Sequence, residues 1–337
     1  MTLALESGAL LADKPSGPTS HDVVAFARRL LGTPRVGHTG TLDPLATGLL
    51  VLLFGRATRL AQFLAADDKE YLADIRLGIE TPTYDAASLD AAVAAADVRR
   101  PTDADLASAL AGFRGSFLQT PPPYSAKKVA GTRAYVSARR SEPVDLKPVP
   151  VTVHELELLA PPSGPDPLVR VRVSASAGFY VRSLAHDLGR VLGCGAHLAA
   201  LRRTRIGRFP VTSALPLSAD EVGSNRGQTG VRRGSDGGQT GVRRGSDRGQ
   251  TGVRPGSDPF RLAFRSMNEL LDHLPAVTLT DEGLRRAQNG NSLAPHHLAG
   301  HGVGSGHRMR ILDPDGEVLS IAERRADGLL HPLLVLR

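Results

Sequence analysis

The sequence predicts an α+β fold, in which helices pack on a mixed or antiparallel central sheet. Segments with the alternating apolar and polar residues of half-buried strands recur up to about residue 210. Segments with helical periodicity also occur there, but they do not follow the strands one for one, as they would in a parallel α/β sheet. The chain has 337 residues, of which 41% are hydrophobic, and this is enough for one large domain and a small one.

The first expected elements are a helix, a buried strand and a second helix. Ser20 is of a type that caps the start of a helix, and Gly32 is of a type that ends one. Between them, apolar side chains share one helical face: Val23, Val24, Ala27, Leu30 and Leu31. The uninterrupted apolar segment 49–54 predicts a buried strand, and residues 58–65 are expected to form the second helix.

The later elements are three strands and a helix. Residues 71–77, 149–158 and 168–174 alternate as strands do, and in the last segment the valines and arginines point to opposite faces. A helix is expected from about Tyr180 to Leu192, where Gly193 ends it.

The net charge of +7 and the isoelectric point near 10 are compatible with a nucleic-acid partner, but the charge is unevenly spread. Residues 226–258 consist of an 11-residue unit that occurs three times: RGQTGVRRGSD, GGQTGVRRGSD and RGQTGVRPGSD. With seven Arg and three Asp, this repeat carries a charge of +4, so the rest of the chain carries only +3. The partner of the folded part must therefore be inferred from where its basic residues cluster.

Each unit of the repeat contains one Val and three or four Gly, so it has no apolar stripe to bury. Its composition is compatible with an inert linker and with an Arg/Gly segment that holds RNA loosely. The inert linker is favoured, because composition alone does not show binding. We therefore expect a domain at 1–215, a low-complexity linker at 216–260 and a small C-terminal domain at 261–337.

Cysteine and histidine are interpreted as structural. The single cysteine, Cys194, excludes an internal disulfide and a multi-Cys zinc site, and a buried thiol is favoured over a nucleophile because no activating base is evident. Four histidines lie in a Gly-rich C-terminal setting without Cys or acidic ligands, which favours a loop over a metal site: His296, His297, His301 and His307. No apolar run is long enough to span a bilayer and no secretory leader is evident, so a cytoplasmic protein is expected.

The segment GHTGTLDP, residues 37–44, lies between the first helix and the buried strand. Its two glycines allow close backbone approach, and Pro44 stiffens the chain directly after Asp43. Such a loop can hold a catalytic carboxylate at the end of a rigid element, but Asp-Pro is also common in turns. Local chemistry alone favours the turn.

The wider sequence resembles the bacterial TruB family of tRNA pseudouridine synthases. The segment GHTGTLDPLATG at 37–48, followed by GRAT at 55–58, closely resembles the catalytic motif of that family. Further matches appear in family order between about residues 8 and 210: DKPSGPTS at 13–20, KEY at 69–71, QTPPPYSAKK at 119–128, GFYVRSLA at 178–185, LGCGAH at 192–197 and LRRTR at 201–205.

The resemblance implies a pseudouridine synthase fold, followed by a small β-rich, PUA-like RNA-binding domain. It also implies isomerisation of uridine-55 in the TΨC arm of tRNA, in which the N1 glycosidic bond breaks and the uracil rejoins the sugar through C5. No redox cofactor, ATP or metal is implied, because the displaced group is the substrate's own uracil. The implied partner is the T-arm stem-loop of tRNA, bound by a monomeric enzyme with no membrane attachment and no obligate protein partner.

Three residues match the family's catalytic positions. Asp43 matches the nucleophile, a carboxylate that either attacks the substrate covalently or helps to remove a proton. Arg182 is expected to keep Asp43 ionised through a charge-assisted pair. The resemblance places Tyr71 against the target base, with a further part in proton removal from C5.

Three more residues match positions around the extruded base. The resemblance places His38 beside the displaced bases, and Tyr180 and Leu201 along the uracil pocket. Each has a structural alternative: a loop histidine bonded to backbone, a core aromatic and an ordinary helix residue, respectively. Basic residues adjoin these motifs and are expected to contact phosphates of the stem-loop: Arg28, Arg29, Arg35, Lys127, Lys128, Arg139, Arg140, Arg202, Arg203 and Arg205.

Two rival functions share this scaffold. A non-catalytic protein that binds or folds tRNA would be favoured if the carboxylate or its arginine were missing, and both are present. A guide-RNA-dependent pseudouridine synthase shares the catalytic core, but the short C-terminal module and the absence of a Lys-rich tail favour the stand-alone form.

Overall fold

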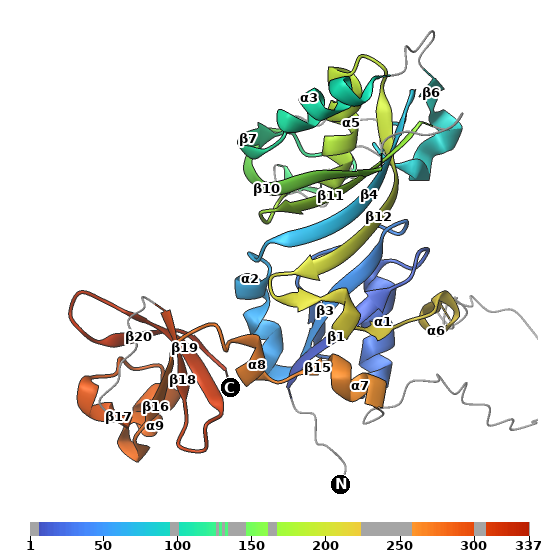
Figure 1. Ribbon diagram of the computed structural model, residues 1–337. Helices are drawn as coiled ribbons and strands as arrows, with labels where there is room; N and C mark the ends of the chain where they lie inside the picture. The colour runs from blue at the N-terminus through green and yellow to red at the C-terminus, as the bar shows by residue number, and fades with distance from the viewer. Residues whose placement is uncertain are drawn as a thin grey trace, which may run out of the picture.

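The computed structural model describes residues 7–94, 101–125, 128–129, 132–133, 146–160, 167–223, 258–299 and 308–336. Within these ranges, helices pack on a large mixed sheet, and a small second sheet forms the C-terminal part of the chain (Figure 1). The repeat up to residue 257 lies outside the described residues, as do Lys127, Arg139, Arg140, His301 and His307. None of the helices in these ranges combines the length and the apolar character needed to cross a membrane.

The large sheet has 11 strands in the described part of the chain. Its main path runs β14-β1-β3-β12-β4-β11-β10-β7, and β13, β15 and β2 pair beside it with β12, β1 and β3. The pairs β1–β14 and β3–β12 are parallel and the others are antiparallel, so the expected mixed sheet is confirmed. The strands are β1 (Gly8–Lys14), β2 (Val36–His38), β3 (Thr47–Phe54), β4 (Lys69–Leu77), β7 (Gly115–Gln119), β10 (Val149–Ala160), β11 (Leu168–Ala175), β12 (Ala196–Ile206), β13 (Phe209–Pro210), β14 (Leu215–Pro216) and β15 (Phe264–Arg265).

The second sheet has the order β17-β16-β18-β19-β20. It consists of β16 (Ala276–Leu279), β17 (Leu298–Ala299), β18 (Arg308–Leu312), β19 (Val318–Arg324) and β20 (Leu330–Val335). Two short hairpins complete the strands: β5 (Ile79–Glu80) with β6 (Val93–Ala94), and β8 (Lys128–Val129) with β9 (Thr132–Arg133).

The α-helices of the described ranges are α1 (Ser20–Leu31), α2 (Ala61–Leu64), α3 (Asp103–Ala111), α5 (Val181–Val191), α6 (Ala219–Gly223), α7 (Asp258–Ala263), α8 (Met267–Leu270) and α9 (Asp281–Gln288). Four 3₁₀ helices lie between them: η1 (Gly55–Leu60), η2 (Ala86–Ala91), η3 (Val211–Ser213) and η4 (Pro295–His297). Figure 1 shows α3 and α5 beside β4, β10 and β11, whereas α1, α7 and α8 lie at the other end of the sheet.

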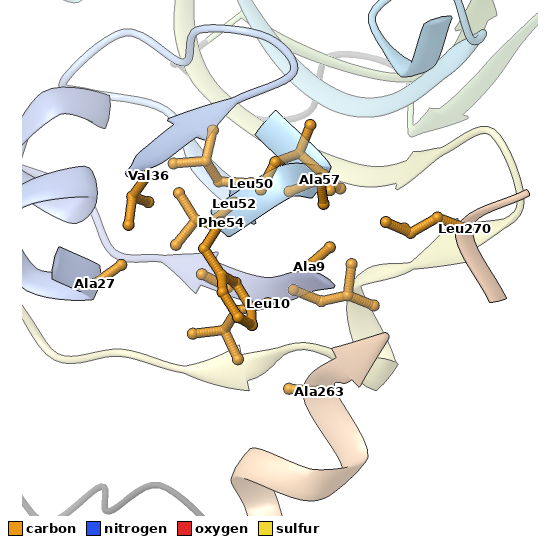
Figure 2. Close-up of a cluster of buried hydrophobic side chains, with 14 of the residues drawn as sticks. Ala9, Leu10, Ala27, Val36, Leu50, Leu52, Phe54, Ala57, Ala263 and Leu270 are labelled. Carbon is orange, nitrogen blue, oxygen red and sulfur yellow. The ribbon is translucent and has the colours of Figure 1, made fainter. Parts of the chain in front are cut away.

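Two separate apolar cores support the large sheet. One joins α1, β1 and β3 to α7 and α8, and Figure 2 shows Leu10 and Leu52 in the same cluster as Ala27, Ala263 and Leu270. The other core packs α3 and α5 against β4, β10, β11 and β12. The strands where these two cores meet, β3, β12 and β4, are adjacent in the middle of the sheet. A third, smaller core lies within the C-terminal sheet.

The first helix differs from expectation at its start. It spans Ser20–Leu31 and ends at Gly32, which has a left-handed φ of 64°, as the sequence predicted. Its N-cap, however, is Thr19, which forms a capping box with Asp22. Ser20 does not cap the helix because its hydroxyl is bonded to Leu42, in the loop before β3.

For the other elements, the predicted type of secondary structure is more accurate than the predicted first and last residues. Residues 58–65 were expected to form one helix, but they divide between η1 and α2, and the Thr58 hydroxyl bonds to the Gly55 carbonyl within the tighter turn. The expected helix 180–192 is one residue shorter at each end, because Tyr180 is the extended N-cap of α5.

Leu201 is a strand residue, so its interpretation as an ordinary helix residue is wrong. It belongs to β12, which pairs with β4 on one side and with β3 on the other. The segment is rich in Ala and Leu, which are good helix formers, but pairing on both sides in the middle of a sheet overrides that weak preference.

Candidate active site

Asp43 lies in the loop between β2 and β3, and the segment after β1 holds this loop from outside. The backbone amide of Gly17 donates to the Pro44 carbonyl at 2.8 Å. The Ser20 hydroxyl donates to the Leu42 carbonyl at 2.9 Å and accepts from the Leu42 amide at 2.8 Å. Two segments that resemble separate family motifs are thereby bonded together, and the residues on both sides of Asp43 are fixed.

The guanidinium of Arg182, in the first turn of α5, faces the Asp43 carboxylate. Its Nε lies 3.0 Å from Asp43 Oδ2, and its Nη1 lies 3.5 Å from Asp85 Oδ2. Nη1 also donates to the Thr83 carbonyl at 3.1 Å, and Nη2 to the Tyr124 carbonyl at 2.9 Å. The Arg182 side chain is only 8% exposed, so these partners fix it between two acids.

The environment of Asp43 acts on its pKa in opposite directions. Burial raises the pKa of this carboxyl above its usual value, the adjacent Arg182 lowers it, Asp85 raises it and Lys14 lowers it. The side chain nevertheless keeps 36% of its surface exposed, toward the cavity that it lines. A carboxylate with a raised pKa is more basic, and hence more nucleophilic, than an ordinary aspartate.

Lys14, at the end of β1, is the second cation near Asp43. Its side chain is fully buried, and its Nζ donates to the carbonyls of Pro15 and Pro44 at 2.8 and 3.3 Å. Burial lowers the pKa of Lys14 to about 8, against the opposing effect of Asp43 and Asp22.

Tyr71 and Arg203 form the opposite wall. They are direct cross-strand partners on β4 and β12, and the Arg203 guanidinium is hydrogen-bonded to the Tyr71 side chain. Arg203 is only 2% exposed and donates to the carbonyls of Leu49, Gly40 and Thr41 at 2.8, 3.0 and 3.4 Å. Burial lowers the pKa of Arg203, while Tyr71 acts against this change. One buried arginine thus connects the tyrosine to the start of the Asp43 loop.

These groups surround one cavity with a volume of about 290 Å³. Such a volume lies at the small end of ligand pockets and suits a single base or sugar better than a larger ligand. The residues that line it are Thr39, Gly40, Thr41, Leu42, Asp43, Ala65, Lys69, Tyr71, Ser176, Gly178, Phe179, Tyr180, Val181, Arg182, Leu201 and Arg203. The structure therefore brings together five of the six residues singled out from the sequence.

The sixth, His38, ends β2 just before the cavity wall and is absent from its lining. Its ring meets that of His21 edge to face, with the centroids 6.0 Å apart, and its buried Nδ1 has no hydrogen-bond partner among the described residues. Burial lowers the pKa of His38, and His21 and Arg203 lower it further. A largely buried histidine thus precedes the cavity wall, in an environment that disfavours its charged form.

Gln119 holds the start of α5 in place. Its amide nitrogen donates to the Tyr180 carbonyl at 3.0 Å, and its amide oxygen accepts from the Tyr180 amide at 2.8 Å. One residue on, the Thr120 carbonyl accepts from the Ser183 hydroxyl at 2.7 Å. The Pro-rich segment therefore positions both Tyr180 and the first turn of α5, where Arg182 lies.

Two family models match the chain one after the other. The model of the N-terminal domain of the TruB family of pseudouridylate synthases matches residues 28–181, and that of the C-terminal domain of tRNA pseudouridylate synthase B matches residues 182–222. A tRNA pseudouridine synthase B of Thermobifida fusca is 40% identical over 344 residues, which cover 98% of this chain and 99% of that protein. The chain belongs to the TruB family.

Other comparisons agree with this assignment. The tRNA pseudouridine synthase B of Aromatoleum aromaticum is 52% identical over 215 residues, 64% of this chain and 68% of that protein. A solved structure of an H/ACA RNP bound to a substrate RNA matches with a TM-score of 0.64 and 23% identity, over 99% of this chain and 86% of that chain. At this identity the likeness concerns the fold alone, and the expected α+β pseudouridine synthase fold is confirmed.

Sequence reasoning missed Asp85 and misjudged Arg203 in this TruB-family site. Asp85 lies in an unremarkable loop, and its link to Arg182 arises only through the fold. Arg203 was assigned to phosphate contact, which is wrong because its side chain is buried against carbonyls. Side chains two apart on a strand share a face, so recognition of β12 as a strand would have placed Arg203 beside Leu201.

The neighbouring arginines are also engaged within the protein. Arg202 forms two hydrogen bonds with the Asp13 carboxylate, at 3.0 and 2.6 Å, and Arg205 lies 3.4 Å from Glu70. Of the arginines expected to contact phosphate, Arg28, Arg29 and Arg35 are exposed. They lie in the last turn of α1 and just before β2, whereas the loop that carries Asp43 contacts the first residue of α1. Phosphate contacts are therefore better sought near α1 than on β12.

Cys194, His296 and His297 are absent from the lining of this cavity. Cys194 is 1% exposed, and burial raises its thiol pKa, which is the setting of an inert cysteine. Within the described ranges, no group of three or more His, Cys, Asp or Glu side chains is placed to hold a metal ion. His296 and His297 belong to η4, and their rings contact each other.

Proposed function

We propose that this chain is a tRNA pseudouridine synthase, an isomerase that converts uridine-55 of the T arm to pseudouridine. The observation that carries the proposal is the Asp43 carboxylate, exposed to a small cavity and held 3.0 Å from the buried Arg182. Membership of the TruB family and relatives named tRNA pseudouridine synthase B, at 40% and 52% identity, support the same substrate.

The reaction balances within one nucleoside. The N1–C1′ bond breaks and a C5–C1′ bond forms, while N1 gains a proton and C5 loses one. Asp43 is the nucleophile, attacking either the sugar or the uracil ring, and Arg182 stabilises its carboxylate before attack and after release. Tyr71 packs against the base and takes part in proton removal from C5, with its hydroxyl held by Arg203.

The target uridine must leave its stack to reach Asp43. The apolar wall formed by Leu201 and the ring of Tyr180 offer contacts to both sides of an extruded uracil. His38 ends β2 just before the cavity wall, and we place it beside the bases that the uridine leaves behind. The exposed arginines of α1 and the turn after it, Arg28, Arg29 and Arg35, contact backbone phosphates of the stem-loop.

The rest of the chain supports RNA binding. We propose a catalytic domain at 1–215, a low-complexity linker at 216–260 and a C-terminal domain at 261–337 that binds RNA in a PUA-like manner. Residues 258–271 tie the last part to the first, because α7 and α8 pack in the core of β1 and β3. The enzyme acts as a monomer in the cytoplasm and needs no cofactor or obligate protein partner.

The test is conversion of an unmodified T-arm stem-loop RNA, measured as pseudouridine released by nuclease digestion. We expect the unsubstituted chain to convert the single target uridine, with EDTA present as well as without it. Asp43→Asn keeps the side-chain shape but removes the nucleophile, so its activity should fall by more than about 1,000-fold.

Asp90→Asn is the matched control, because Asp90 is an exposed aspartate of η2 outside the cavity. It should retain full conversion. An active Asp43→Asn enzyme would contradict the assigned nucleophile, and a stem-loop left unmodified by the unsubstituted chain would contradict the proposed function.

A further inference from the structure

The loop between β5 and η2 contains an unusual backbone conformation. Tyr84 has a φ of 63°, and among the described residues it is the only one other than glycine with a positive φ. This left-handed region is unfavourable for a residue with a Cβ, and bulky side chains adopt it only where their surroundings impose it. The conformation lies between Thr83 and Asp85, the two residues of this loop that contact Arg182.

The Tyr84 ring is stacked on the ring of His186. The ring centroids are 3.9 Å apart and the planes differ by 5°. His186 follows Arg182 by one helical turn on α5, so the two side chains share a helix face. The same face of α5 therefore holds this loop twice, once through the Tyr84 ring and once through the Arg182 guanidinium.

Other bonds close the loop on itself and on β12. The Leu198 amide donates to the Tyr84 carbonyl at 3.0 Å. The Thr83 hydroxyl donates to Asp85 Oδ1 at 2.6 Å, and the Thr81 hydroxyl donates to the Asp85 carbonyl at 2.7 Å. These bonds fix the backbone of the loop around Asp85, and the stack on His186 holds the side chain of Tyr84 against α5.

We propose that Tyr84 is a positioning residue, whose ring on His186 keeps the left-handed turn that presents Thr83 and Asp85 to Arg182. The proposal rests on the proposed function, in which Arg182 supports the Asp43 nucleophile. If the stack is lost, residue 84 can return to an ordinary φ, and the Thr83 carbonyl and Asp85 carboxylate turn away together. Arg182 then loses two of its four partners and holds Asp43 less precisely.

The first test compares side chains at position 84, using kcat and KM for the T-arm stem-loop. Tyr84→Ala should lower kcat about tenfold with KM unchanged, because residues 81–85 do not line the cavity. Tyr84→Phe keeps the stacked ring and should stay within about twofold of the unsubstituted enzyme. Tyr84→Gly lacks the ring but adopts the positive φ without cost, so it should recover part of the kcat that Tyr84→Ala loses.

The second test asks whether Tyr84 acts through Asp85. In an Asp85→Asn enzyme, the added Tyr84→Ala change should lower kcat by less than about twofold, since the two residues act on one guanidinium. Additive effects would mean that the ring serves the fold in general. Phe113→Ala is the matched control: it removes another aromatic contact, with Phe117 at 6.2 Å, and should lower the Tm without changing kcat.

The outcomes separate this inference from the proposed function. A stem-loop left unmodified by the unsubstituted enzyme overturns the proposed function. The role of Tyr84 alone is overturned if the unsubstituted enzyme converts the stem-loop and Asp43→Asn is inactive, but Tyr84→Ala keeps full kcat. The same holds if Tyr84→Phe is as slow as Tyr84→Ala. If Tyr84→Ala does not fold, His186→Ala removes the stack from the other side and must give the same tenfold loss.

Discussion

Arg182 and Arg203 are buried arginines on two walls of one cavity, and their surroundings differ. Arg182 lies between the carboxylates of Asp43 and Asp85, at 3.0 and 3.5 Å. Arg203 makes no ion pair within the described residues and instead donates to three backbone carbonyls, besides its bond to Tyr71. Arg182 acts on the proposed nucleophile, whereas Arg203 acts mainly on the backbone that carries it.

From this difference we expect Arg182 to serve the proposed chemistry and Arg203 to serve mainly the fold of the loop that carries Asp43. Removal of Arg182 takes away the cation that contacts both acids, which disfavours ionised Asp43 although Lys14 remains nearby. Removal of Arg203 leaves carbonyls of the catalytic loop and of β3 without donors, which costs folding free energy first. The two substitutions should therefore separate activity from stability.

The largest expected effect on activity is that of Arg182→Met. This substitution keeps the length of the side chain but removes the charge, so the pKa of Asp43 rises and less of it is ionised. Single-turnover conversion should slow by about 100- to 1,000-fold. Arg170→Met is the control, because Arg170 pairs with Asp74 on the exposed surface, 54% exposed, and should leave the rate unchanged. Equal rates for the two variants would contradict the role of Arg182.

Arg203→Lys should affect stability more than rate. Lysine keeps the charge, but its single ammonium group cannot replace the planar guanidinium that donates to three carbonyls. The free energy of unfolding should therefore fall by about 1–3 kcal/mol. Urea denaturation followed by circular dichroism measures this loss. The folded fraction should retain more activity than Arg182→Met. A variant as stable as the unsubstituted protein but as slow as Arg182→Met would place Arg203 in the reaction and remove the contrast.

The smallest expected effect concerns the repeat, which carries a charge of +4. If the chemistry is confined to the cavity walls, deletion of residues 226–257 should change kcat by less than about twofold and leave α7 intact from Asp258. The change in kcat is measured as conversion of the stem-loop at low and at high salt. A large loss at high salt alone would assign RNA binding to the repeat.

The sequence predicted most of what is local or carried by a motif. The C-terminal end of α1, the strands β4, β10 and β11, and α5 follow from periodicity and from glycine positions. Five of the six expected site residues line one cavity, because the motifs that contain them are recognisable before the fold is known.

What the sequence did not predict depends on contacts between distant segments. Ser20 resembles a helix cap, and only its bond to Leu42 shows why Thr19 takes that place. Arg203 resembles a surface arginine until β12 is placed between β3 and β4. No local sequence pattern marks Asp85, because its importance comes from its contact with Arg182, which lies far away in the sequence.

The central claim is that Asp43 performs the chemistry in the cavity and is not needed to bind RNA. The most direct measurement is a single-turnover reaction with excess enzyme, combined with the Kd of the same stem-loop for the unsubstituted chain and for Asp43→Asn. We predict a Kd within about threefold for the two proteins and pseudouridine formation by the unsubstituted chain alone. Pseudouridine formed by Asp43→Asn at the unsubstituted rate, or a loss of RNA binding that accounts for its inactivity, would contradict the claim.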